Sequence, residues 1–239
     1  MRNPISVVCL LVLLAAEAIP CGADPSGIEL GVGMVRPAID PARPLYFYLS
    51  PDLALDPSQL SPSDSLTFRE GTHYVDIGTA PPWLVPEWSK LDYDILLLRA
   101  QSLSQRWIEV VVNDHPDRPR AFPRTAWIAR EGAQFETWPE FLLGVFSVEP
   151  LDPDANPLRS GPGESFPEVA PSADLTLRVV AVQGSWAKVA AEFEDEAGAP
   201  PAHGPIRWRS GDRLSPSTTR SQLTLCRTRA PGPNRRGSA

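Results

Sequence analysis

The chain has 239 residues, of which 42% are hydrophobic and 21% are charged, a composition that supports a packed core and argues against wholesale disorder. Its net charge of −7 excludes general nucleic-acid binding, because that function needs a cationic face. Proline contributes 28 residues, and since proline breaks helices and central strands, short elements joined by many turns are expected.

The N-terminus has the pattern of a secretion signal. Arg2 precedes an apolar run over 5–16, which has the length of a signal-peptide core and is too short to span a membrane. Cleavage after Ala18 would follow a small-x-small site, and the product would be freely secreted. The alternative is lipidation of Cys21, which would anchor the protein as a lipoprotein. We therefore expect residues 1–23 to hold the signal peptide and the start of a linker, with both fates open.

The first half of the chain predicts an array of short strands. Residues 19–44 are rich in Pro, Gly and Ala and are interpreted as a linker. Three Ser-Pro or Asp-Pro pairs in residues 50–65 predict a long surface loop. A polar turn at 101–106 separates two apolar runs and predicts a hairpin. One short helical turn is expected at 138–143, and no longer helix, because helical periodicity is absent. The strands are expected at 45–49, 66–68, 74–77, 92–100, 107–112 and 125–130.

The second half repeats this layout more compactly. A tight loop is expected at 156–163 and a polar loop at 194–203. Beyond Ser215 the composition predicts a disordered tail, 216–239. Residues 207–239 hold eight Arg and one Asp, so they carry +7 while residues 1–206 carry −14. The strands are expected at 145–149, 175–182, 186–193 and 206–208.

The two halves agree in the order and spacing of their elements. The distance from Trp107 to Ile128 is 21 residues, and that from Trp186 to Ile206 is 20. Each half has an apolar strand, a turn with Gln and Ser, a Trp, a second strand, a polar loop and a short strand. This agreement predicts two copies of one module.

The second copy resembles the bacterial SH3 family. Residues 158–163 (LRSGPG) are similar to its "NvRsGPg" element, and residues 184–189 (GSWAKV) to its "ggWykV". Gly204-Pro205-Ile206 stands where the family has "GWv", with Pro in place of Trp. The resemblance implies an all-β fold with two small SH3-like β-barrels in tandem, at 44–142 and 143–215. A barrel of short strands also leaves no free sheet edge.

The sequence offers no pattern of catalytic or metal-ligating residues. The three histidines, His73, His115 and His203, lie in Pro-, Gly- or Asp-rich segments. Neither an HExxH, GxSxG or CxxC motif nor a Cys-His pairing occurs. We therefore expect neither catalytic residues nor a metal or cofactor.

Aromatic side chains are the candidates for ligand binding. We expect Trp107 and Trp186, which follow the two hairpin turns, to pack in the cores. For the others, core and groove remain open alternatives. Alternation along a strand places Tyr46 and Tyr48 on one face, so both should be buried or both displayed. The candidate ligand-binding residues are Tyr46, Tyr48, Trp83, Trp88 and Trp127.

These patterns together predict a monomeric, non-catalytic binding or targeting protein outside the cytoplasm. The family resemblance implies a cell-wall peptide or an envelope protein as its partner. Nucleic acid is not expected as a partner, and membrane contact is expected only through a lipid at Cys21. The alternatives are an envelope lipoprotein that serves as a scaffold in a protein assembly and, more remotely, an accessory hydrolase.

Overall fold

The computed structural model describes residues 30–148, 154, 156–170, 176–191, 203–210 and 213–214. Strands account for 46% of these residues and helices for 8%, which confirms the expected all-β class. The predicted signal peptide with Cys21 and the predicted tail 216–239 lie outside the described residues. No helix in the described ranges is long and apolar enough to cross a membrane.

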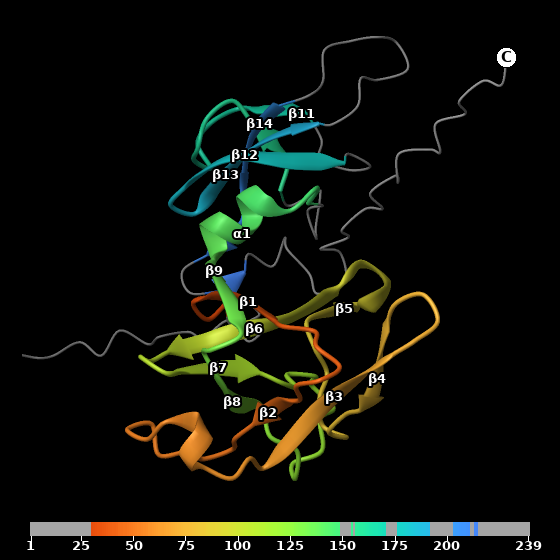
Figure 1. Cartoon of the computed structure of the whole chain (residues 1–239). Helices are drawn as coiled ribbons and strands as arrows, with labels where there is room; N and C mark the ends of the chain where they lie inside the picture. Colours follow the sequence, from red (N-terminus) through yellow and green to blue (C-terminus); the bar gives the residue numbers. More distant parts are fainter. Residues whose placement is uncertain are drawn as a thin grey trace, which may run out of the picture.

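The N-terminal part contains two sheets that enclose one core (Figure 1). The larger sheet has the order β8-β7-β6-β1-β9, with β5 also paired to β6, and the smaller one has the order β2-β3-β4. The strands of the N-terminal part are β1 (Gly33–Pro37), β2 (Leu45–Phe47), β3 (Asp64–Glu70), β4 (Val75–Thr79), β5 (Trp88–Lys90), β6 (Ile95–Leu103), β7 (Trp107–Val111), β8 (Thr125–Ala129) and β9 (Ala133–Thr137). Phe47 and Leu66 from the smaller sheet pack with Leu98, Val110 and Ile128 from the larger one in a single buried cluster.

The prediction of a linker over residues 19–44 is wrong for β1. This strand pairs antiparallel with both β6 and β9 and lies inside the larger sheet. Met34 and Val35 are fully buried in it. Gly33, one of the residues that suggested a linker, has a structural role instead. A Cβ on Gly33 would lie 2.1 Å from the carbonyl oxygen of Glu136, so glycine permits the close approach of β9.

The central hairpin is present, with shifted bounds. Residues Leu91–Tyr93 form a 3₁₀ turn, η2, and Asp94 has a left-handed backbone with φ of 54°. Strand β6 therefore begins at Ile95 rather than at 92, and it extends to Leu103 into the predicted turn. The short strand at 125–130 is confirmed as β8, while β9 was not predicted.

The C-terminal part is built around the three-stranded antiparallel sheet β12-β13-β14. It is preceded by the helix α1 (Trp138–Gly144), which replaces the single turn that we predicted. The remaining elements are β10 (Leu158–Arg159), β11 (Glu168–Ala170), β12 (Leu177–Gln183), β13 (Trp186–Ala191), β14 (His203–Arg207), β15 (Arg209–Ser210) and β16 (Arg213–Leu214). The meander β12-β13-β14 has the same strand order as β6-β7-β8 in the N-terminal part.

Helix α1 lies between the two parts and contributes to a core that they share (Figure 1). Phe141 is 1% exposed and belongs to a cluster with Met34 and Leu97 on one side and Leu177 and Val189 on the other. The boundary that we drew between residues 142 and 143 falls inside this helix.

Two tryptophans expected in the cores differ in burial. Trp107 is fully buried, as expected, whereas Trp186 is only half-buried. Trp208 is buried instead, 6.5 Å from the ring of Trp138, and its indole N–H donates to the carbonyl of Gly184 at 3.0 Å. The end of the second meander is thus fixed by a residue that follows β14.

Candidate functional site

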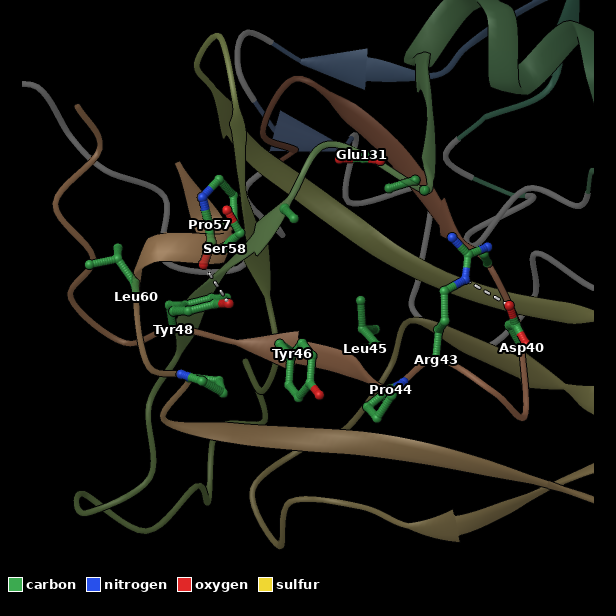
Figure 2. Close-up of a pocket in the computed structure, with 15 residues that line it drawn as sticks. Asp40, Arg43, Pro44, Leu45, Tyr46, Tyr48, Pro57, Ser58, Leu60 and Glu131 are labelled. Carbon is green, nitrogen blue, oxygen red and sulfur yellow. Dashed lines mark hydrogen bonds and ion pairs between the residues drawn. The ribbon is translucent and has the colours of Figure 1, made fainter. Parts of the chain in front are cut away.

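An open groove of about 650 Å³ crosses the N-terminal part (Figure 2). Three segments of the chain line it, two of them close in sequence and the third far from both. Residues between 38 and 48 line the groove along its length. Residues between 57 and 62 form one wall, and residues between 129 and 133 form the other. The lining is mainly apolar and includes three prolines. Such a surface suits contact with an extended chain rather than an enclosed small molecule.

Tyr48 is held rigidly in this groove. It is 6% exposed, and its ring meets the ring of Trp107 edge-on at 5.0 Å between centroids. Its hydroxyl donates to the carbonyl oxygen of Pro57 at 3.3 Å. Its backbone N–H and carbonyl both pair with Trp127, at 2.9 and 2.8 Å. Burial, followed by the neighbouring hydroxyl of Tyr46, raises the pKa of Tyr48, so this side chain stays neutral and keeps the proton that it donates to Pro57.

Tyr46 is the displayed ring of the groove. It lies on β2 opposite Ser65 and is 44% exposed. Within the described residues its hydroxyl has no hydrogen-bond partner. The expectation that Tyr46 and Tyr48 share one degree of exposure is therefore wrong, although both rings line the same groove (Figure 2). The cause is the 57–62 wall, which covers Tyr48 and leaves Tyr46 open.

The 57–62 wall is an ordered turn rather than a loose loop. The 3₁₀ helix η1 (Pro57–Gln59) begins after Asp56, whose carboxylate accepts hydrogen bonds from the hydroxyl and backbone N–H of Ser58, at 2.7 and 3.0 Å. These bonds, with a smaller contribution from Arg106, lower the pKa of Asp56. The indole of Trp107 donates to the carbonyl of Leu55 at 3.2 Å. The wall is therefore attached to the core through Leu55, just before it, and through Pro57, whose carbonyl accepts from Tyr48.

The rim of the groove carries charges of both signs. Asp40 and Arg43 form an ion pair with 2.8 Å between Oδ2 and Nε. The hydrogen bond from Arg43, then that from the Ala42 N–H, lowers the pKa of Asp40. Glu131 stands exposed on the opposite wall, and within the described part of the chain its carboxylate forms no ion pair. Glu131 is thus the carboxylate of the rim that remains open to an incoming cation.

The other predicted aromatics do not line this groove. Trp83 is 8% exposed, and its ring packs edge-on against Phe47 at 5.3 Å inside the core. Trp88 is half-buried on β5 and packs against the cluster that contains α1. Trp127 is half-buried on β8 and touches the groove through its backbone pairing with Tyr48. The structure thus brings Tyr46 and Tyr48 together and separates Trp83 and Trp88 from them.

Sequence reasoning missed the polar members of the groove. Asp40 and Arg43 lie in the segment interpreted as a linker, and Glu131 directly follows the strand predicted at 125–130. The Pro pairs of residues 50–65 were a usable signal for the wall, but the contact of that loop with Trp107 is tertiary. Among the described residues no three His, Cys, Asp or Glu side chains are grouped to hold a metal ion.

Comparison of the chain with protein-family models, with curated proteins and with solved structures gave no match.

Proposed function

We propose that this protein is a non-catalytic binding module that works outside the cytoplasm and holds an extended peptide in the groove of Tyr46 and Tyr48. The peptide belongs to the cell wall or to an envelope protein. The proposal is carried by one observation. Tyr46, which is 44% exposed, lies beside the buried Tyr48 in an open groove with prolines on its wall.

The chemistry of the groove favours an extended peptide over a folded surface. Tyrosine offers a large flat contact area at low cost in conformational entropy. An extended or polyproline-type chain has its side chains free to lie on such rings. The free hydroxyl of Tyr46 can donate to a carbonyl of that chain. The resemblance of residues 158–163 and 184–189 to the bacterial SH3 family supports a binding role of this kind.

The predicted export signal supports the extracytoplasmic location. A second candidate function, a scaffold lipoprotein in the envelope, is favoured by the position of Cys21 directly after the apolar run of residues 5–16. Mass spectrometry of the mature protein separates the two. A chain that begins at Ile19 indicates free secretion, a lipid-modified Cys21 indicates the lipoprotein, and a cytosolic chain that retains Met1 contradicts both.

The groove is tested by sedimentation of the protein with purified, insoluble peptidoglycan. We expect the parent chain to sediment with the wall and Tyr46→Ala to stay largely in the supernatant. Tyr74→Ala is the matched control, because Tyr74 is equally displayed, at 51% exposure, but does not line the groove. Equal sedimentation of the parent and Tyr46→Ala, or an equal loss in both variants, would contradict the assignment.

A further inference from the structure

The C-terminal segment after Leu214 has a composition that the proposed function does not use. Its 25 residues contain five arginines and no acidic residue, which gives +5, whereas residues 1–214 carry −12. Near its end it contains Pro231-Gly232-Pro233, with Arg227 and Arg229 before it and Arg235 and Arg236 after it. This is a short proline segment flanked by cations, attached to an acidic protein.

From these features we infer that the segment 227–239 of the same chain occupies the groove of Tyr46 and Tyr48. This inference rests on the proposed function, because it names an occupant for the same groove. In this arrangement the proline segment lies against Tyr46, and a flanking guanidinium reaches Glu131. The chain thereby covers its own binding surface when no other ligand is present.

The groove complements both the prolines and the arginines of the segment. The exposed face of Tyr46 lies between Pro44 and the 57–62 wall (Figure 2), and flat aromatic faces accept proline rings and guanidinium groups. Glu131 is an open carboxylate on the rim, whereas the carboxylate of Asp40 is already held by Arg43. A cation is therefore directed to the Glu131 side of the groove.

The segment is long enough to reach. The 17 residues from Leu214 to Pro231 span up to about 55 Å when extended. A domain of this size has a radius of gyration of only about 15–17 Å, so any surface position is within range. Linkage within one chain supplies an effective concentration in the millimolar range when the linker is short. An interaction that is weak between separate molecules is then sufficient to occupy the groove.

The chain provides its own probe for the test. Cys226 directly precedes the segment, and Cys21→Ser in the chain from Ile19 onward leaves Cys226 as its one thiol. A nitroxide attached to Cys226 broadens the amide signals of nearby residues in NMR spectra. We expect the signals of Leu60 and Gly132 to lose most of their intensity, while that of Val189 in the core of the C-terminal part does not.

Two variants of the full chain give the controls. Replacing Pro231 and Pro233 with Ala and Arg235 and Arg236 with Gln should restore the signals. The pair Tyr46→Ala and Glu131→Gln should restore them as well, because these substitutions remove the surface that the segment contacts. Raising the ionic strength should also weaken the broadening, since the contact is partly between exposed charges.

Several results would overturn the inference. The first is an absence of broadening in the groove, and the second is broadening that survives both sets of substitutions. A third is broadening that arises only between a spin-labelled molecule and a separate isotope-labelled one, since the segment would then belong to a second copy. If the groove signals broaden as expected but no variant sediments with peptidoglycan, the proposed partner is wrong and the inference stands. If the parent chain sediments and no broadening occurs, the inference alone fails.

Discussion

Tyr46 and Tyr48 are two residues apart but have different physical roles. Tyr48 is buried between Trp107 and the 57–62 wall, while Tyr46 displays its ring and a free hydroxyl. A residue that serves binding should be replaceable without loss of fold, and a residue that holds the groove together should not.

We expect Tyr48→Ala to destabilise the protein by about 3–5 kcal/mol, the cost of removing a large aromatic ring from a core. The substitution also removes the hydrogen bond to Pro57. Tyr46→Ala should change the free energy of unfolding by no more than about 0.5 kcal/mol, as at other exposed positions. Denaturant unfolding of both variants measures this. If Tyr46→Ala costs as much as Tyr48→Ala, the ring of Tyr46 is structural.

The tryptophans show why sequence could not sort these rings. Trp83 and Trp127 both occur near prolines or turns and were equally good candidates for a groove. Trp83 packs against Phe47, and Trp127 pairs through its backbone with Tyr48. Both partners lie far away in the chain. Local alternation also failed at Tyr48, because β2 ends at Phe47 and the next residue is covered by a loop.

Strand β1 shows how composition can mislead. The run Gly33-Met34-Val35 is short and is bordered by residues typical of linkers, yet it pairs with two strands. The hairpin β6–β7 was predictable because both strands are long apolar runs around one polar turn. The pairing of β1 was not predictable, because its two partners, β6 and β9, lie far from it in the sequence.

The role of Gly33 can be tested by adding a single methyl group. Gly33→Ala places a Cβ 2.1 Å from the Glu136 carbonyl oxygen and 2.9 Å from the ring of Phe135. We expect a loss of about 1–3 kcal/mol, as for other overpacked sites. Gly144→Ala is the control, since nothing lies within 4 Å of its added Cβ and alanine favours a helix. A neutral Gly33→Ala would show that β1 and β9 are not held this closely.

The start of α1 gives a prediction for pH. The carboxylate of Glu140 accepts hydrogen bonds from the hydroxyl and the N–H of Thr137, at 2.7 and 2.8 Å, and these lower its pKa. A carboxyl with a lowered pKa in the folded state stabilises the protein above its ordinary pKa of about 4.3 and loses this effect as the pH falls through the lower value.

Glu140→Gln keeps an oxygen that can accept these hydrogen bonds but removes the charge. We expect the variant to melt below the parent at pH 7, and the difference in Tm to close as the pH falls below about 4. Thermal unfolding at several pH values measures this difference. A gap in Tm that stays constant down to pH 2 would mean that the charge of Glu140 does not act at the helix start.

The N-terminal and C-terminal parts share the core around α1. The repeat of strand–turn–strand units was visible in the sequence and appears as the meanders β6-β7-β8 and β12-β13-β14. The shared core was not visible, because a seven-residue helix has too few positions to show a periodicity. Met34, Leu97 and Leu177 belong to one buried cluster that includes residues of that helix.

We therefore expect Phe141→Ala to loosen both parts together. Phe141 is 1% exposed, and its removal should cost about 3–5 kcal/mol. Amide hydrogen exchange should then accelerate in β7 and in β13 alike. Acceleration confined to β13, with β7 unchanged, would show that the C-terminal part unfolds by itself and that the shared cluster does not couple the two.

NMR mapping of a soluble wall fragment shows whether the groove of Tyr46 and Tyr48 binds wall peptide. Muropeptides released from purified peptidoglycan are titrated into the isotope-labelled chain, and the shifted amide signals are placed on the structure. We predict saturable shifts in residues 38–48, 57–62 and 129–133, all of which disappear in Tyr46→Ala. Shifts confined to β12, β13 and β14, or no saturable shift at all, would contradict the assignment of this groove as the site of wall-peptide binding.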